Sequence, residues 1–554
     1  MEKNQNQQEK ALFFLILILY VFITIIGLPV DLIEPDATLY ATISRTMIEN
    51  SDIINLYSLG HDWLDKPHLP FWITALSFKI FGVSNWAYKL PAILTFFFGI
   101  WMTFKFAQKN YSTKVAYFAA IILAISTHSI ISNFDVKAEP YLTAFIIASI
   151  YYFDRYLKKN THKSFILACL FSGLAIMTKG IFSMIPIAAA LGGELLLKRN
   201  WKQLFNPSWI FAFLLIFLII LPELIALYLQ FDLHPEKVVF NKTGVSGIRF
   251  FFWDSQFGRF FNTAPIKGSG DIFFFFHTIL WAFLPWGILF YIASFLKIKR
   301  NIPKIQISEE FYTLSGSVIT IAIFSLSQFQ LAHYTNIIFP FMAILVADFL
   351  LKLSSIYQKF QRSITCLFWF QNSSILIAII ILHYFLKPNF NSLIIPIIVF
   401  TIFILWEIYH SEISKTMNLF LISVVIFLVC YGYLFSHFYP TILPFQSGKN
   451  AASFINNNFD GKARLLDNRY HHFGFEFYLK TPLIRVDTLQ IHQEKGKVFY
   501  LDKKELAILN RKNIDFQIIK EIPNFQVSKL SPQFLSESTR NQSLETRFLV
   551  MVTD

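Results

Sequence analysis

The sequence predicts a polytopic α-helical membrane protein with about 13 transmembrane helices, followed by a small C-terminal α/β domain. Three observations lead to this prediction. The 554 residues are 55% hydrophobic and include 65 Phe, and the mean hydropathy is +0.50. Only 15% of the residues are charged, whereas a soluble globular protein has about 25%. Apolar runs of about 20 residues recur along most of the chain, and each is long enough to cross a hydrocarbon core of about 30 Å.

The individual spans follow from the apolar runs. The first run lacks a small-residue cleavage site and is too long for a signal peptide, so we expect it to stay as an anchor. Clusters of Lys and Arg fall on every second connection, as the positive-inside rule requires if the N-terminus is cytoplasmic. The predicted spans are residues 11–30, 88–107, 114–131, 140–157, 165–179, 181–197, 208–230, 273–295, 309–327, 334–351, 365–386, 392–409 and 419–436.

Residues 1–436 form the predicted transmembrane domain, and its orientation sends segments 31–87, 132–139 and 231–272 outside. Segment 31–87 is too polar to span, but "LYATISRTMI" and "PFWITALSFKIFG" are amphipathic. We therefore expect interfacial helices there rather than an ordinary solvated loop. Residues 437–554 form the predicted extracytoplasmic domain, because "KARLL" and "KVFYL" are typical of strands and "GKNAASFINNNF" is typical of a helix.

Charge and motifs exclude several classes of function. The formal net charge of +13 is explained by cationic loops on the cytoplasmic side of a membrane, so no nucleic-acid partner is expected. The three cysteines lie inside apolar runs, which argues against a disulfide framework or a zinc site. The sequence has no glycine-rich phosphate loop, no HExxH and no GxSxG motif.

Ionisable residues gather at the predicted outer ends of the spans. Several carboxylates beside several cations at one membrane face suit a reaction on an anionic lipid headgroup, because Lys and Arg can hold a phosphate while a carboxylate acts as a base. The alternative is that these side chains only snorkel to the interface and anchor headgroups. The residues are Glu34, Asp36, Asp65, Lys66, Asp135, Lys137, Glu139, Lys179, Arg249, Asp254, Arg259, Lys267, His333 and Tyr334.

The stretches "PDATLYATISRTMIEN" and "HDWLDKPHLPFW" resemble the first outer loop of the C-type membrane glycosyltransferases, in particular the bacterial aminoarabinose-transferase and protein-mannosyltransferase-like group. "GLAIMTKGIF", "FFWDSQFGRF", "FLPW" and "FSLSQFQLAHYTNIIFP" match later segments of that family in the same order, so the resemblance covers roughly residues 10–350. It implies a polyprenyl-phosphate-linked sugar donor and a lipid, glycan or protein acceptor. Transfer would proceed with inversion at the outer face of the cytoplasmic (inner) membrane, among membrane lipids.

The resemblance also implies roles for individual residues. Asp36 falls on the catalytic aspartate of the family. The expected contacts to the donor phosphate are Tyr40, Lys66, Arg259 and Tyr334. The expected residues that line the site or contact the acceptor are Trp63, Asp65, Asp135, Glu139 and His333.

Some positions depart from the family pattern. Ala37 and Leu39 stand where an acid and an Arg are usual, which leaves open whether Glu34 and Arg45 replace them. Gln256 stands where the family has a His, so no metal site is carried over. No cofactor is therefore assigned, and a divalent cation is left open.

Direct attack of the acceptor at the anomeric carbon would invert that carbon and release the prenyl phosphate. We expect Lys66, Arg259 and Tyr334 to stabilise the leaving phosphate. Asp36 would be the base for a hydroxyl acceptor, or would position the sugar if the acceptor were itself an anion. The alternative for Asp36 is a helix cap. "DIFFFFH" (271–277) is a candidate lining for a groove that holds the prenyl chain, and simple lipid-facing packing is the alternative.

Three other functions stay open at this stage. A transporter or flippase for lipid-linked sugars would need charges inside the spans, for which Glu223 beside Pro222 is the best candidate. An oligosaccharide polymerase or ligase would act on prenyl-linked glycans at the same face. A non-catalytic scaffold or sensor would use only the C-terminal domain to bind a partner. No internal repeat supports a transporter built from two halves.

Overall fold

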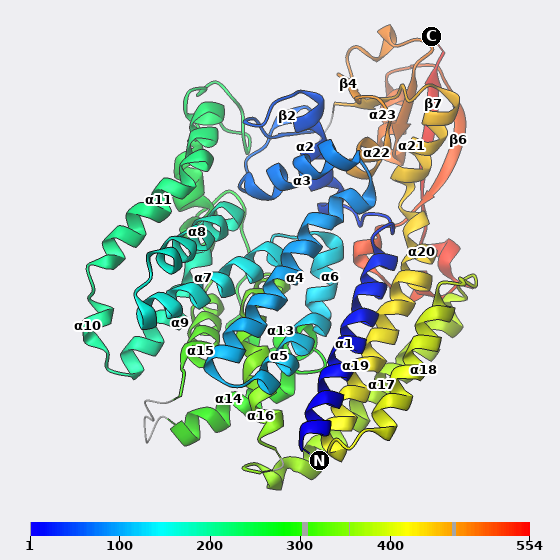
Figure 1. Ribbon diagram of the computed structural model, residues 1–554. Coiled ribbons are helices and arrows are strands. Elements are labelled where there is room, and N and C mark those ends of the chain that lie inside the picture. The colour runs from blue at the N-terminus through cyan, green and yellow to red at the C-terminus, as the bar shows by residue number, and fades with distance from the viewer. Residues whose placement is uncertain (1, 302–308, 354, 468–471, 554) are drawn as a thin grey trace.

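The computed structural model describes residues 2–301, 309–353, 355–467 and 472–553. A bundle of long helices makes up most of the molecule, and a mixed β-sheet with short helices lies at one end of it (Figure 1). The N-terminus lies at the opposite end of the bundle from the sheet. Helices α2 (Asp36–Glu49) and α3 (Leu69–Phe81) lie at the same end as the sheet.

Six described helical segments are long and apolar enough to cross a membrane, and eight are if two bent pairs each count as one span. The prediction of a multi-pass helical membrane protein is therefore confirmed, while the number of 13 spans and the orientation of the termini stay predictions. The helices of the bundle are α1 (Glu2–Gly27), α4 (Asn85–Asn110), α5 (Thr113–Ile125), α6 (Thr127–Asp135), α7 (Glu139–Lys159), α8 (His162–Lys179), α9 (Met184–Leu197), α11 (Ser208–Leu227), α13 (Phe274–Ala282), α14 (Gly287–Asn301), α15 (Tyr312–Ser325), α16 (Phe339–Leu351), α17 (Gln361–Leu386), α18 (Ile394–His410) and α19 (Lys415–Tyr433).

Two spans that were predicted as single helices are broken, which corrects the sequence-based boundaries. Segment 273–295 contains α13 and α14, which meet at 119°. Pro285 lies between them, and its ring and missing N–H prevent a helix from continuing. Segment 114–131 contains α5 and α6, which meet at 54° where Ser126 is extended. Because α6 runs on to Asp135, the predicted outer loop 132–139 shrinks to the turn 136–138.

The first outer segment is ordered by its own apolar residues. It contains α2, the antiparallel pair β1 (Tyr57–Ser58) and β2 (His61–Asp62), and α3. Ile43 and Met47 of α2 are buried against Phe71 and Ala75 of α3. Apolar side chains at this spacing place one face of each helix against the other, so these stretches form helices and not a solvated loop. Their position in the membrane interface stays a prediction.

The C-terminal part is an α/β structure around a five-stranded sheet of order β4-β3-β5-β7-β6. Strand β3 is parallel to β4 and β5, whereas β7 is antiparallel to β5 and β6. Leu465 and Leu466 belong to hydrophobic clusters on opposite faces, so both faces of the sheet are covered. The elements are α20 (Tyr439–Ile442), α21 (Ser447–Asn458), β3 (Arg464–Leu466), α22 (Phe473–Tyr478), β4 (Ile484–Val486), β5 (Val498–Leu501), α23 (Lys503–Arg511), β6 (Phe516–Asn524), α24 (Pro532–Leu535) and β7 (Glu545–Val552).

The loop between β2 and α3 is anchored on helix α11 by a buried ion pair. The His68 N–H donates to Glu223 Oε2 at 2.9 Å, and Nδ1 lies 3.1 Å from Glu223 Oε1. The other ring nitrogen, Nε2, faces the Ile54 carbonyl at 2.8 Å and must donate to it. Burial lowers the pKa of His68, but Glu223 outweighs it and the pKa is raised. Glu223, the candidate for a transport pathway, therefore holds this loop.

Replacing Glu223 with Leu should lower the free energy of unfolding by about 3 kcal/mol, because the buried His68 loses both bonds. Glu223→Gln is the matched control. Its amide can accept from the His68 N–H and donate to Nδ1 of a neutral imidazole, so its effect should be much smaller. Thermal unfolding in detergent measures both, and a Glu223→Leu protein as stable as the wild type would contradict the anchoring role.

Candidate functional site

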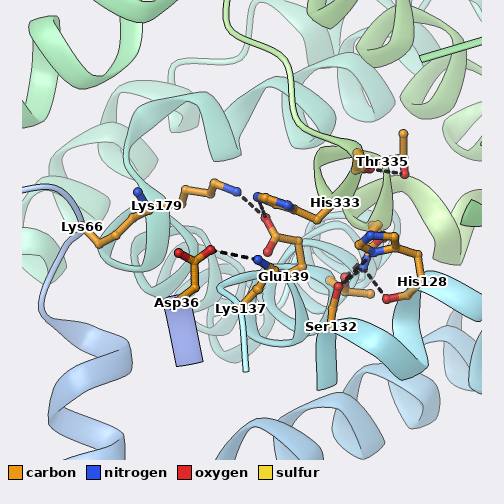
Figure 2. A network of polar contacts seen from close by, with 12 residues as sticks. Asp36, Lys66, His128, Ser132, Lys137, Glu139, Lys179, His333 and Thr335 are labelled. Atoms are coloured by element: carbon orange, nitrogen blue, oxygen red, sulfur yellow. Dashed lines mark hydrogen bonds and ion pairs between the residues drawn. The ribbon is translucent and has the colours of Figure 1, made fainter. Parts of the chain in front are cut away.

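A polar cavity of about 220 Å³ lies among α2, α3, the α6–α7 turn, the end of α8 and segment 329–334. All of the site residues predicted from the sequence line it, except Trp63 and Asp135. Figure 2 shows that Asp36, Lys66, Glu139 and Lys179 lie close together here although they come from distant parts of the chain. The residues that line the cavity through charged or polar groups are Asp36, Tyr40, Ser44, Asp65, Lys66, Thr74, Tyr88, Lys137, Glu139, Thr178, Lys179, Arg259, His333 and Tyr334.

Asp65 binds two cations on one wall of the cavity. One carboxylate oxygen forms an ion pair with Lys66 and the other with Arg259. Burial raises the pKa of Asp65, but Lys66 and Arg259 outweigh it and bring the value to about 2. Arg259 also lies 5.4 Å from the ring centre of Phe329, and its buried Nε has no hydrogen-bond partner. This guanidinium therefore keeps a donor available for a further acceptor.

Asp36 is held by Lys137, a residue of the α6–α7 turn. Lys137 Nζ lies 3.0 Å from Asp36 Oδ2 and 3.0 Å from Asp135 Oδ2. Burial lowers the pKa of Lys137, but the two carboxylates outweigh it and the pKa is raised. The Asp36 side chain is 46% exposed and that of Asp135 only 13%, so Asp36 is the carboxylate that a ligand can reach.

The structure contradicts the capping alternative for Asp36. Helix α2 begins at Asp36 itself, its N-cap is Pro35, and no side chain caps it. The Asp36 carboxylate is bonded to Lys137 instead (Figure 2). Its position at the first residue of a helix places it in the favourable field of the helix N-terminus.

A second buried carboxylate closes the far side of the cavity. Glu139 Oε1 forms an ion pair with Lys179 and lies 3.8 Å from His333 Nε2, while Glu139 Oε2 is buried without a hydrogen-bond partner. Lys179 Nζ also lies 4.1 Å from the ring centre of Tyr334. Figure 2 shows Lys179 and His333 reaching Glu139 from different elements.

Two of the site residues predicted from the sequence do not line the cavity but lie behind residues that do. Trp63 packs edge-on against Tyr40, with ring centres 6.1 Å apart, and so supports it from behind. Asp135 lies beyond Lys137 and balances its charge. Glu34 and Arg45, considered as replacements for the family residues missing at positions 37 and 39, do not line the cavity.

Lys137 and Lys179 belong to the site, although the sequence did not single them out from the other charges at the span ends. The available signal was a lysine at or next to the outer end of a predicted span, where a charge is costly unless it is paired. That signal does not show which carboxylate each lysine meets, because the partners come from other helices.

A second cavity of about 100 Å³ adjoins the polar one, and we call it the apolar cavity because its lining is the more apolar of the two. The two share Asp65, Lys66, Lys179, Arg259 and Tyr334, which therefore lie at the boundary between them. The apolar lining comes largely from residues Leu64, Leu142, Phe182, Leu227, Phe250, Phe251, Phe260, Phe324 and Ile337. None of residues 271–277 lines either cavity and Phe273 is 68% exposed, which favours lipid-facing packing for this run.

No metal ligand set is seen in the described part of the chain, where no group of three or more His, Cys, Asp or Glu side chains could hold an ion. Gln256 instead ties two backbone groups together. Its Nε2 donates to the Lys179 carbonyl at 3.1 Å and its Oε1 accepts from the Phe182 N–H at 3.1 Å.

Comparisons with known proteins found relatives by sequence and by fold. Residues 65–225 match the family model described as dolichyl-phosphate-mannose-protein mannosyltransferase. A protein of Aquifex aeolicus is 28% identical over 57% of the chain. The undecaprenyl phosphate-alpha-4-amino-4-deoxy-L-arabinose arabinosyl transferase of Edwardsiella ictaluri is 26% identical over 62% of the chain. The matches span 59% and 60% of the length of these two relatives.

The fold is similar to that of a solved structure along nearly its whole length. ArnT from Cupriavidus metallidurans, in a crystal structure bound to undecaprenyl phosphate, superposes with a TM-score of 0.75. The match covers 97% of both chains at 16% identity. Fold and cavities thus define a multi-pass membrane protein with a charged site at one end of the bundle. The predicted resemblance to the C-type membrane glycosyltransferases is confirmed.

The ion pairs of Asp65 with Lys66 and Arg259 should make a pH-dependent contribution to the stability of the fold. The folded pKa of about 2 lies below the ordinary value of 3.8, so the stabilisation is fully present above about pH 4 and is lost as the pH falls through 2. Arg259→Met should therefore lower the melting temperature at pH 7. The difference in melting temperature between this variant and the wild type should become smaller as the pH falls towards 2.

Arg249→Met is the control for this prediction, because the Arg249 side chain is 74% exposed and its ion pair with Asp254 is long, at 3.8 Å. It should change the melting temperature little at any pH. If Arg259→Met has the same melting temperature as the wild type at pH 7, the ion pair between Arg259 and Asp65 does not stabilise the fold.

Proposed function

We propose that this protein is a membrane glycosyltransferase that moves a sugar from a polyprenyl-phosphate donor to an acceptor at the outer face of the cytoplasmic membrane. One observation supports this more than any other: the cations Lys66, Lys179 and Arg259 lie at the boundary between a polar and an apolar cavity. A polyprenyl-phosphate sugar has the same arrangement, because its phosphate lies between a polar sugar and an apolar chain.

The phosphate would replace Asp65 as a partner of the two cations. Lys66 and Arg259 already point at one carboxylate, and the buried Arg259 Nε has a donor to spare. Charge-assisted hydrogen bonds from such groups are the strong ones, and they gain strength as the leaving phosphate takes up charge. Tyr334, above Lys179, supplies a hydroxyl at the same boundary.

The reaction needs few further groups. The acceptor hydroxyl gives its proton to Asp36, and its oxygen forms a bond to the anomeric carbon. The bond from that carbon to the phosphate oxygen breaks, and its electron pair stays on the phosphate. Attack opposite the leaving group inverts the carbon. Lys137 keeps Asp36 in place, and the half-exposed position of Asp36 leaves it open to the acceptor.

The relatives suggest the chemical class of the substrates. An arabinosyl transferase among them is named for an undecaprenyl phosphate sugar, and the matched family model is named for a mannosyl donor on dolichyl phosphate. A lipid, glycan or protein acceptor, a hexosyl or pentosyl donor, 13 spans, a cytoplasmic N-terminus and an extracytoplasmic C-terminal domain all belong to this proposal. The position of Glu223, bonded to His68, removes the feature that most favoured a transporter.

Asp36→Asn should lower the rate of sugar transfer by about 100-fold or more, because the acceptor loses its base. The protein should remain folded, since the amide can keep a hydrogen bond to Lys137. Asp52→Asn is the control, as Asp52 lines neither cavity and accepts bonds from the backbone of Ile54 and Asn55. Transfer of a radiolabelled sugar from polyprenyl phosphate by purified protein measures both, and full activity of Asp36→Asn would refute the assignment.

Ser255→Trp should raise KM for a long-chain donor about tenfold, since the indole would fill the apolar cavity and displace about two buried CH₂ groups. A donor with a short, soluble chain should be affected much less. Ser538→Trp, at an exposed position of the C-terminal part, serves as the control. Equal KM values for Ser255→Trp and wild type on the long-chain donor would show that the chain binds elsewhere.

A further inference from the structure

The segment that carries Asp36 into the site is attached to the C-terminal domain. Between α1 and α2, the chain runs as a short connection of residues 28–35. Gln446 accepts from the Glu34 N–H at 2.9 Å and donates to the Leu32 carbonyl at 2.9 Å, so one side-chain amide binds two backbone groups. The Leu32 N–H donates to the Tyr478 hydroxyl at 3.1 Å. Gln446 is only 5% exposed, which shields these bonds from water.

The Glu34 side chain occupies a niche that exists because two residues are glycines. A Cβ atom on Gly474 would overlap the Glu34 carboxylate, and all three of the nearest atoms belong to Glu34. A Cβ on Gly448 would lie 2.6 Å from the Phe475 backbone nitrogen and 2.9 Å from the same carboxylate. Neither glycine has a positive φ, so the fold does not need glycine there for its backbone angles. Gly474 therefore provides room for the Glu34 side chain, and Gly448 also allows the close approach of the α22 backbone.

A second attachment lies further along α2. Arg45 Nη1 donates to the carbonyls of Phe477 at 2.9 Å and Leu479 at 2.6 Å, at the end of α22. Its Nε donates to Glu49 at 2.6 Å, and the residue is 7% exposed. Asp36 and Tyr40 therefore lie between two attachments to the same domain, one before α2 and one near its end.

We propose that the C-terminal domain positions Asp36 for the reaction, with Gln446 and the Gly474 niche as the positioning elements. This rests on the proposed function. The cations that would hold the donor phosphate come from other places: Lys66 from the β2–α3 loop, Lys179 from α8 and Arg259 from the segment after α12 (Gly247–Arg249). Loosening the attachment therefore displaces Asp36, and Tyr40 with it, but leaves the three cations that would hold the donor phosphate in place.

The first test replaces Gln446 with Leu, which keeps the size of the side chain and removes both of its hydrogen bonds. Amide hydrogen exchange should become faster at Leu32 and Glu34 and along α2. The kcat for sugar transfer should fall about tenfold, since small misplacements of a reacting group have effects of this size. The KM for the polyprenyl-phosphate donor should change much less than kcat, because the three cations keep their places.

The second test is Gly474→Ala, which fits the helical backbone and meets only the Glu34 side chain. It should lower kcat and speed exchange in the same segment as Gln446→Leu does. Gly192→Ala is the matched control, because it also lies inside a helix and has nothing within 4 Å of an added Cβ. It should behave as the wild type in both measurements.

The two measurements separate this proposal from the proposed function. Hydrogen exchange needs no substrate, so it tests the attachment even if the wild type transfers no sugar, in which case the proposed function fails. Wild-type kcat in either variant overturns the positioning role. Faster exchange throughout the molecule together with a raised donor KM also overturns it, because that result indicates a general loss of structure. A fall in kcat alone, with faster exchange confined to residues 31–49, supports it.

Discussion

The ion pairs of Asp65 with Lys66 and Arg259 are the contact on which the site depends. They bring together a loop near the N-terminus and a segment almost 200 residues further on, at the point where the polar cavity meets the apolar one. Two cations left side by side in a partly buried place would repel each other. The carboxylate between them offsets this repulsion and directs both cations at one point.

Two sets of contacts with the surrounding structure hold this part of the site in place. Glu223 of α11 holds the loop through His68, and the C-terminal domain holds the start and the end of α2 through Gln446 and Arg45. Buried bonds to backbone groups are costly to break, since each group left behind loses its partner. The first outer segment thus contacts both the helix bundle and the C-terminal part, and its Asp36 and Lys66 line the cavity.

Much of this could be predicted from the sequence, and the rest could not for identifiable physical reasons. Carboxylates and cations at the ends of apolar runs indicated that Asp36, Lys66 and Arg259 share one membrane face, because unpaired charges at such places are costly. Hydropathy does not register a bend, however, so the breaks at Ser126 and Pro285 were missed. The pairing of Lys137 with Asp36 depends on the turn that follows the first break.

The sequence also could not show which residues far apart in the chain contact each other. The positions of Glu34 and Arg45 suggested substitutes for missing site residues, yet both side chains turn to the C-terminal domain. The run of phenylalanines at 273–276 suggested a groove, yet the cavity is lined by aromatic residues of segment 250–260, which a helical irregularity turns towards the site. In each case the residue type suited the role, but the fold places residues from another part of the chain at that position.

The central claim is that the phosphate of a lipid-linked donor binds at the boundary between the two cavities. A cryo-EM structure of the protein with polyprenyl phosphate tests it most directly. We predict phosphate density within about 4 Å of both Lys66 Nζ and the Arg259 guanidinium, with Asp65 displaced from at least one of them and the chain in the apolar cavity. A phosphate bound elsewhere, with both ion pairs of Asp65 intact, would contradict the account.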